Sequence, residues 1–509
     1  MTKYSDLEYL KLSRWGKLRY RVACFFCAIP TTLKSLLLRI LGFFKKLGLG
    51  IRDEFRDIGQ TFKNGSGKTK LSYLIMGYGN LRRGQVLRGL LFLLFEGVFI
   101  WYMATTGAHW LSMLPSLGHQ GPTEAYDVIL DIYTTEYHDN SFKILLYGVL
   151  TVFFIIAFLY TWRLNVRQNS ISERILASGK KLKSGRDDMR SLVDDQFHKT
   201  LLALPLLGIL IFTVLPIVFM ILVAFTNYDG THDGYNNALF HWVGMTNFNT
   251  MLNWTVGSNS YAATFGEVLT WTLIWAFFAT FTNYFLGMLV AMAINRKGIR
   301  FKKGWRTILV LTIAIPQFIS LLYVSKMFSK NGIINGLLLS LGWIDQALPF
   351  WEDPTWARIT VILINIWIGI PYLMLIATGI LMNIPQDLYE SARIDGANAR
   401  QQYAKITLPY MLFITGPYLL TSFTGNMNNF NVIYLLTAGG PTNRAASTAA
   451  GSVGYTDLLI TWLFKITTGA ESQYYLASVV GILVFVVVAL ISLIVYNLLP
   501  SIKNEEDFQ

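Results

Sequence analysis

Residues 475–499 read YLASVVGILVFVVVALISLIVYNLL, an apolar stretch that contains no Asp, Glu, Lys or Arg. A membrane core about 30 Å thick is crossed by about 20 apolar residues in a helix, so this stretch predicts a membrane-spanning helix. The same pattern recurs along the chain, and each run is predicted to span the membrane. The predicted spans are Arg88 to Gly107, Phe142 to Trp162, Leu201 to Phe225, Gly266 to Ile294, Thr307 to Val324, Ile359 to Leu381, Ile406 to Phe423 and Tyr475 to Leu499.

The composition of the 509 residues agrees with a membrane protein. Hydrophobic residues make up 53% of the chain and charged residues only 14%, whereas a soluble domain carries roughly a quarter charged residues. The net charge of +13 does not indicate nucleic acid as a partner, because the basic residues lie in short segments between apolar runs. That distribution is typical of the cytoplasmic side of a membrane protein.

Lys and Arg also predict the orientation of the chain. They are concentrated between Arg163 and Arg190 and between Arg296 and Lys303, and none occurs at 108–142 or 201–295. Because cytoplasmic loops carry an excess of Lys and Arg, both termini are predicted to lie in the cytoplasm. This requires an even number of spans. The predicted fold is therefore an all-α, multi-pass integral membrane protein with eight transmembrane helices.

Residues 1–87 are predicted to form a cytoplasmic N-terminal region. Within it, the apolar stretch Val22 to Phe44 is interrupted by Pro30, Lys34 and Arg39. A charge near the centre of a span costs at least about 3 kcal/mol. We therefore interpret this stretch as an amphipathic helix that lies on the cytoplasmic leaflet, with a true span as the alternative.

Two short motifs in the N-terminal region resemble functional sites. Cys24 and Cys27 have C-x-x-C spacing, but they lie in an apolar stretch and are interpreted as packed thiols. Residues 65–69, GSGKT, resemble the end of a phosphate-binding loop, yet Phe62 stands where that loop needs glycine and 53–63 does not alternate like a strand. We interpret 65–69 as a basic linker. The chain is predicted to hydrolyse no nucleotide and to contain no catalytic or metal-binding residues.

A polar segment separates the sixth and seventh predicted spans. Residues 384–409 read IPQDLYESARIDGANARQQYAKITLP. Pro385 suits the first position of a helix and Asp387 suits its first turn, whereas Gly396 interrupts a helix at about 1 kcal/mol. The pattern predicts two short helices joined at a glycine bend on the cytoplasmic face, as a docking surface for another protein or as an ordinary loop.

This segment resembles the EAA signature of ABC-importer permeases. The matching residues are Glu390, Ala392, Gly396, Ile406, Leu408 and Pro409, and Ser391 stands where alanine is usual. The resemblance implies a coupling helix, at about 385–402, that inserts into a cleft of an ATPase subunit. The residues implied in this coupling are Glu390, Ala392, Asp395 and Gly396.

The resemblance extends from about Leu201 to the C-terminus. This part is similar to the larger permease of maltose and maltodextrin importers. The segments that carry the likeness are Asn428 to Phe430, Leu435 to Pro441 and Tyr455 to Leu459. The resemblance implies that 199–509 form the ABC permease core and that 88–198 supply two preceding helices and a basic loop. Only about 40 residues separate the third and fourth spans, as in the Gram-positive type rather than the enterobacterial one.

Polar residues within the spans predict a sugar site. Asn365, Gly369 and Tyr372 share one face of the sixth span, and Ser422, Asn426 and Asn429 have the same spacing at the end of the seventh. Amides replace the hydrogen bonds of sugar hydroxyls, and aromatic rings cover sugar CH faces. The alternative is that these amides only join helices. Pro316 and Pro371 are predicted to kink the fifth and sixth spans.

The family resemblance implies a larger substrate-binding set. It comprises Gln317, Asn365, Trp367, Ile368, Gly369, Tyr372, Ser422, Asn426 and Asn429. Gln317 stands where the family has serine, and Ile313 stands where it has tyrosine.

The predicted function is that of a non-catalytic permease subunit that imports an oligosaccharide, most simply maltose or maltodextrin, through a bacterial plasma membrane. The expected partners are a second homologous permease, an ATPase dimer that binds the ATP, an extracellular sugar-binding lipoprotein, the oligosaccharide and the lipid bilayer. No cofactor is expected on this chain. The alternative is a self-sufficient ion-coupled transporter, which would need a carboxylate in the membrane. Glu96 is the clear candidate, but we expect it to bond a neighbouring helix or subunit.

Overall fold

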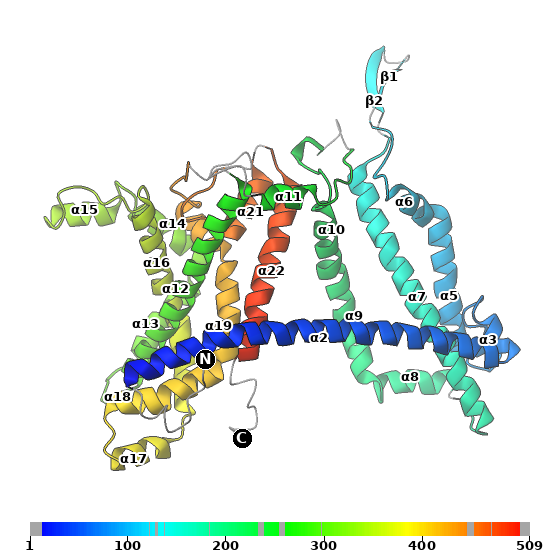
Figure 1. The fold of residues 1–509 in the computed structure, drawn as a ribbon, viewed down its shortest axis with the longest axis horizontal. Helices are drawn as coiled ribbons and strands as arrows, with labels where there is room; N and C mark the ends of the chain where they lie inside the picture. Colours follow the sequence, from blue (N-terminus) through cyan, green and yellow to red (C-terminus); the bar gives the residue numbers. More distant parts are fainter. Residues whose placement is uncertain are drawn as a thin grey trace. The chain divides into compact units, whose positions relative to one another are not determined.

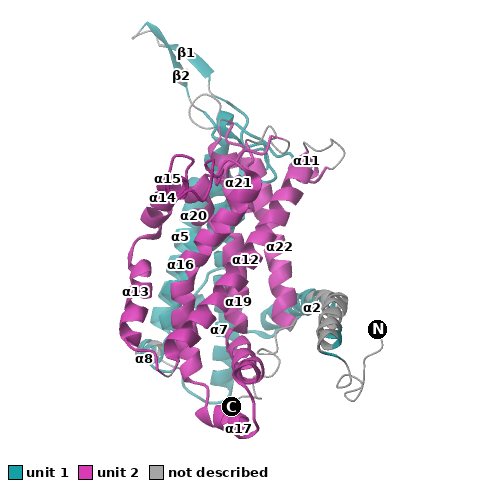
Figure 2. Ribbon diagram, turned by 90° about the vertical axis from the view of Figure 1, so that its left-hand side faces the viewer, with its two compact units in different colours: residues 1–244 teal, residues 245–509 magenta. Residues whose placement is uncertain are grey.

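A computed structural model describes residues 13–121, 123–127, 131–136, 138–182, 184–232, 239–253, 260–296, 298–444, 452–469 and 471–498. The chain divides into two compact units, residues 1–244 and 245–509 (Figure 2). Helices dominate both units, and a two-stranded hairpin is the one sheet in the described part. The predicted boundaries of the N-terminal region, the first two spans and the permease core, at residues 87 and 198, stay predictions.

The first unit begins with a long helix, α2 (Arg14–Asn64), followed by the short helices α3 (Gly67–Leu71) and α4 (Tyr78–Leu81). Its first span combines α5 (Val86–Tyr102), the π-helical turn η1 (Met103–Gly107) and α6 (Ala108–Met113). The hairpin strands β1 (Thr123–Asp127) and β2 (Ile132–Glu136) come next, then α7 (Ser141–Ala177) and α8 (Gly185–Val193). The last span consists of α9 (Phe197–Ile209), η2 (Leu210–Val214) and α10 (Leu215–Val223), and a 3-10 turn, η3 (Gly230–His232), follows.

The second unit holds the remaining spans and the polar segment between them (Figure 1). Its elements are α11 (Thr246–Leu252), α12 (Tyr261–Asn295), α13 (Lys302–Ala314), α14 (Gln317–Met327), α15 (Ile333–Ser340), α16 (Pro354–Met382), α17 (Gln386–Ile394), α18 (Ala399–Gln402), η4 (Tyr403–Thr407), α19 (Leu408–Met427), α20 (Phe430–Thr437), α21 (Leu459–Thr468) and α22 (Tyr474–Leu498). Side chains cap several of these helices. Asp353 accepts hydrogen bonds from the amides of Thr355 and Trp356, each at 2.9 Å, before Pro354 opens α16.

The described residues contain seven helices that are long and apolar enough to cross a membrane, and eight if the bent pair α13–α14 counts as one span. Each predicted span has its counterpart among them, so the predicted all-α membrane fold is confirmed. The fifth span differs from the prediction, because Pro316 separates two helices that meet at 91° rather than kinking one. By contrast, α16 continues through Pro371 without interruption.

The core of the second unit lies between α12 and α16. Trp275 of α12, Val361 of α16 and Val432 of α20 are fully buried in one cluster. Small residues bring the two long helices together: a methyl group on Gly287 of α12 would lie 2.7 Å from Cβ of Leu373 on α16. Close backbone approach at small residues is the usual way in which membrane helices associate, because burial of apolar surface gives little gain in lipid.

The N-terminal region is more ordered than the sequence indicated. The helix predicted at 22–44 extends from Arg14 to Asn64, because the alternation of apolar and charged residues continues past residue 44. It is not among the helices apolar enough to span a membrane. The side chains of Cys24 and Cys27 lie outside the described part of the structure.

The predicted linker at 65–69 includes the start of α3, which begins at Gly67. A helix, not a strand, precedes it, which agrees with the rejection of a phosphate-binding loop. Thr69 donates a hydrogen bond of 2.6 Å to Oε1 of Glu173 on α7, and the Arg83 guanidinium lies 2.8 Å from the same oxygen. The Arg83 side chain is only 3% exposed. Residues 65–69 therefore attach the N-terminal region to α7, which the sequence did not reveal.

Candidate substrate pocket and coupling segment

Pro316 causes the break between α13 and α14 in the fifth span. Pro316 has no amide hydrogen, and its ring disfavours helical backbone at Ile315. Ile315 is accordingly extended, with φ −82° and ψ 128°. The helix resumes at Gln317, and the carbonyl of Pro316 accepts the amide of Ile319 at 3.0 Å. The last carbonyls of α13 and the first amides of α14 thus lack partners within a helix.

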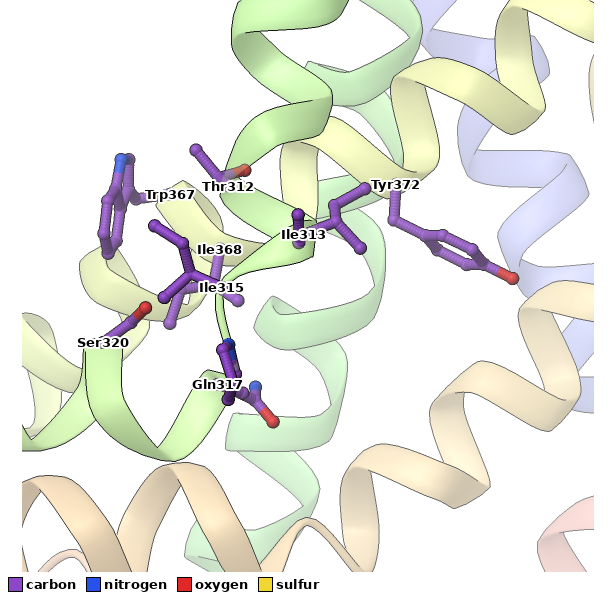
Figure 3. Close-up of a pocket in the computed structure, with 10 residues that line it drawn as sticks. Thr312, Ile313, Ile315, Gln317, Ser320, Trp367, Ile368 and Tyr372 are labelled. Carbon is purple, nitrogen blue, oxygen red and sulfur yellow. The ribbon is translucent and has the colours of Figure 1, made fainter.

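A cavity of about 390 Å³ lies at this break. It is lined by Thr312, Ile313, Ala314, Ile315, Pro316, Gln317, Ser320, Trp367, Ile368 and Tyr372. Trp367 and Tyr372 project from α16 on either side of the Ile313–Ile315 stretch (Figure 3). Their side chains are 51% and 53% exposed. The cavity therefore combines aromatic surface with hydroxyl, amide and backbone hydrogen-bonding groups, and none of its lining residues is charged.

Four of the nine predicted site residues line this cavity: Gln317, Trp367, Ile368 and Tyr372. Ile313, which replaces the tyrosine of the family, also lines it. The break adds Thr312 and Ser320, which the sequence reasoning missed. The signal for them was Pro316, which marks where the helix ends and hence which neighbouring side chains reach the cavity.

Asn365 and Gly369 do not line the cavity and contact α12 instead. The carbonyl of Asn365 accepts a hydrogen bond of 3.4 Å from Nδ2 of Asn283 on α12. Gly369 lies so close to the same amide that an added Cβ would approach Nδ2 to 2.3 Å. Among the described residues, Oδ1 of Asn283 and Nδ2 of Asn365 are buried without a hydrogen-bond partner. Both residues thus contribute to the α12–α16 interface.

The predicted residues of the seventh span join helices in the same way. Nδ2 of Asn426 donates to Oγ1 of Thr280 on α12 at 3.0 Å, and its carbonyl accepts from the indole of Trp275 at 3.1 Å. Asn429 precedes α20, where its Oδ1 accepts the amide of Val432 at 3.4 Å. Ser422 is half-buried on α19.

The polar segment at 384–409 has the two helices, α17 and α18, and the glycine bend that the sequence predicted. Gly396 follows α17 with φ +74°, a left-handed conformation that favours glycine. Glu390, Asp395 and Gly396 are exposed, and Ala392 is half-buried. Ile394, an apolar side chain at the end of α17, is 87% exposed. The Tyr389 and Thr407 hydroxyls lie 2.8 Å apart and connect α17 to the base of the seventh span.

Glu96 bonds within its own chain. Its Oε2 accepts the amide of Met76 at 2.8 Å, in the turn between α3 and α4. The carboxylate thus has a local partner, although this partner is a turn rather than the helix or subunit that we expected. Within the described residues, no group of three or more His, Cys, Asp or Glu side chains is arranged to hold a metal ion.

The second unit thus combines a pocket at a broken span with an exposed polar helix between two spans. Residues 283–504 match the family of binding-protein-dependent transport system inner membrane components. The maltodextrin transport system permease protein MalC of Streptococcus pneumoniae is 32% identical over 447 residues, covering 86% of this chain and 97% of the relative. The chain belongs to this family and is the permease subunit of an ATP-binding-cassette importer.

Two further relatives differ in the extent of the match. The galactooligosaccharides transport system permease protein GanP of Bacillus subtilis is 34% identical over 434 residues, covering 85% of this chain and 97% of the relative. The maltose/maltodextrin permease MalF of Escherichia coli is 36% identical over 233 residues, which are 45% of this chain and 44% of that protein. The match over nearly the full length of the Gram-positive permeases agrees with the resemblance in the sequence. These matches support an ATP-binding-cassette permease and not a self-sufficient ion-coupled transporter.

Proposed function

We propose that this chain passes a neutral oligosaccharide of the maltodextrin class through a bacterial plasma membrane, and that the cavity at the Ile315–Pro316 break is part of the sugar site. The observation that carries this proposal is the juxtaposition of the break with Trp367 and Tyr372. A sugar that enters a membrane must replace its hydrogen bonds to water, because a stranded hydroxyl is expensive to bury.

The chemistry of the cavity supports a neutral sugar. Free carbonyls at the end of α13 accept hydrogen bonds, free amides at the start of α14 donate them, and a hydroxyl does both. The Trp367 ring offers a flat apolar surface to the CH face of a sugar. A charged substrate would call for a compensating charge, and the lining residues have none. The names of the relatives support an oligosaccharide, and maltodextrin is the substrate named for the S. pneumoniae relative.

The remaining predicted residues are proposed to meet the sugar in another state of the transport cycle. Two of them, Asn365 and Gly369, lie on α16. The others lie on α19 or just beyond its end: Ser422, Asn426 and Asn429. Both α16 and α19 pack against α12. The unpaired amide atoms of Asn283 and Asn365 support this proposal, because a buried polar atom without a partner costs about 1–3 kcal/mol. A sugar hydroxyl would satisfy both atoms if α12 and α16 separated.

The energy for transport is proposed to come from partner subunits. The partners are a second homologous permease, two ATPase subunits that bind the ATP, and an extracellular sugar-binding lipoprotein. The exposed Ile394, with Glu390, Ala392, Asp395 and Gly396 around it, suits insertion into a cleft of the ATPase. The distribution of Lys and Arg supports cytoplasmic termini and a cytoplasmic α17. This chain is proposed to have no catalytic residues.

The test is transport by the complete complex in proteoliposomes. We expect ATP-dependent uptake of maltotriose in the presence of the binding protein, and weaker uptake of galactotriose. The permease reconstituted alone should give no flux. Uptake of galactosides but not of glucans would overturn the substrate class, and accumulation driven by a proton gradient without ATP would overturn the coupling.

A further inference from the structure

The part of α2 from residue 43 to its end has three differently composed faces. One row, at intervals of three or four residues, is apolar and exposed: Phe44, Leu47, Ile51 and Phe55 are between 48% and 71% exposed. Four of these large side chains in succession on one helical face are unusual on a surface in water. In a membrane protein, such a row is typical of a helix that lies in the plane of the interface.

The acidic face of α2 is paired with α7. The Arg163 guanidinium lies 2.7 Å from Oδ2 of Asp57 and also pairs with Glu54. Around these contacts, a polar cavity of about 520 Å³ is lined by Asp53, Glu54 and Asp57 of α2 and by Arg163, Arg167 and Arg174 of α7. The acidic side chains of α2 are therefore turned toward the basic end of a membrane-spanning helix.

This pairing holds α2 beside the end of the apolar part of α7. Arg163 directly follows Trp162, where the apolar part of α7 ends, and a tryptophan at the end of a span is typical of the membrane–water interface. The Trp162 indole donates to the carbonyl of Tyr73 at 2.9 Å, and the Tyr73 hydroxyl donates to the carbonyl of Ile58 on α2 at 2.8 Å. In Figure 1, α2 runs across α7. These contacts hold α2 across α7 at the point where the apolar part of α7 ends.

The third face of α2 is basic. It consists of four residues spaced by seven, four and seven positions, which places them in one row on a helix: Lys45, Arg52, Arg56 and Lys63. This row borders the apolar row on the side opposite the acidic face. All four side chains are exposed, and none forms an ion pair with another described residue. Since the acidic residues are compensated by α7, the open edge of α2 carries an uncompensated positive charge.

We propose that α2 binds the acidic-phospholipid headgroups of the cytoplasmic leaflet, with the Phe44–Phe55 row in the acyl boundary and the Lys45–Lys63 row on the phosphates. Charge complementarity selects this occupant, because the leaflet surface is negative and a basic residue near it contributes about fivefold to partitioning.

The experiment is site-directed spin labelling of the complete complex in nanodiscs. Single cysteines are introduced at Leu47 and Ile51 on the apolar row and at Lys46 and Gln60 on the polar side, after Cys24 and Cys27 are changed to serine. In nanodiscs of equal parts phosphatidylglycerol and phosphatidylcholine, oxygen should relax the labels at 47 and 51. A water-soluble nickel chelate should relax those at 46 and 60. All four positions are exposed, so the labels should not disturb folding.

The charge dependence is tested with two matched variants. A variant with Lys45, Arg52, Arg56 and Lys63 changed to glutamine should reduce oxygen access at 47 and 51, to the level found in phosphatidylcholine alone. The charge-preserving variant, with each lysine changed to arginine and each arginine to lysine, should behave like the original chain. Nickel access at 47 and 51 in the acidic nanodiscs would overturn the proposal. So would protection from both reagents, which indicates a protein partner, and so would equal oxygen access in both lipid compositions. None of these readouts depends on sugar transport.

Discussion

Gly369 packs directly on the side-chain amide of Asn283, so that a methyl group at residue 369 would lie 2.3 Å from Nδ2 of Asn283. The contact joins α16 to α12 at the level of Asn365, whose carbonyl accepts the same Nδ2. The Asn283 side chain of α12 therefore lies in contact with α16 at both residues.

Gly369→Ala should destabilise the α12–α16 interface. Overpacking of a close contact costs about 1–3 kcal/mol, which lowers the thermal stability of the purified complex. Asn283→Ala should remove the clash, so the double variant is expected to be more stable than the sum of the single effects allows. Additive losses would show that the two residues do not contact each other in the working complex. Gly425→Ala, whose added methyl meets nothing within 4 Å, is the control.

Trp367→Ala should impair maltotriose uptake while leaving complex yield and melting temperature nearly unchanged. The side chain is half-exposed toward the cavity, so its loss creates little internal void. The lost ring contact is worth about 0.5–1.5 kcal/mol, or roughly 2- to 12-fold in affinity. Trp367→Phe should retain part of the uptake. Uptake kinetics measured on the assembled complex provide the check, and unchanged kinetics in Trp367→Ala would exclude the ring from the site.

Asn365→Ala and Asn429→Ala separate sugar binding from helix packing. If each amide bonds a sugar hydroxyl, its loss costs about 1–3 kcal/mol, or roughly a 5- to 150-fold loss of affinity, with basal ATPase activity preserved. We expect this outcome for Asn365, whose side-chain nitrogen is unpaired. Asn429→Ala should also lower stability, because Asn429 caps α20. A fall in stability with unchanged sugar affinity in both variants would leave the amides with a packing role alone.

Gly396→Pro and Glu390→Lys should disrupt the proposed contact between α17 and the ATPase. Proline fixes φ near −65°, which is incompatible with the φ of +74° at Gly396. Glu390→Lys reverses an exposed charge on α17 without changing the fold. Both variants should insert into the membrane normally, yet lose uptake and sugar-stimulated ATPase activity. Wild-type transport in either variant would exclude that residue from the coupling contact.

Asp457 and Lys465 should behave as an ion pair that is costly to break on one side. Asp457 is fully buried, and its Oδ2 lies 2.6 Å from Nζ of Lys465. Lys465→Met leaves a buried carboxylate without its cation and should cost about 3–5 kcal/mol of stability. The double variant Asp457→Asn/Lys465→Met should recover most of this loss, as measured by thermal unfolding of the complex. A double variant as unstable as Lys465→Met alone would contradict this account.

Hydropathy predicted the spans well because burial in lipid demands long apolar helices, whatever the details of packing. The element that each helix face contacts was harder to predict from the sequence. Asn365, Gly369 and Tyr372 share a face by spacing, yet Asn365 and Gly369 contact α12 while the long side chain of Tyr372 reaches the cavity. Spacing identifies which residues share a face, but the partner of that face depends on contacts distant in sequence.

Two other differences between the predicted and the observed structure have related causes. Pro316 was expected to bend a helix, but the extended Ile315 and the new helix at Gln317 produce two separate helices. Residues 65–69 were interpreted as a linker, and their contact with Glu173, 104 residues beyond Thr69, could not be predicted from the local sequence. Tertiary contacts of this kind leave no local pattern in the sequence.

The break between α13 and α14 has a mechanical consequence. A continuous helix can bend sharply only if it breaks internal hydrogen bonds, whereas none has to be broken at Ile315–Pro316. Reorientation of α14 against α13 then needs rotation about a few backbone bonds only. A change in the angle between α13 and α14 would therefore alter the width of the proposed sugar cavity while both helices stay intact.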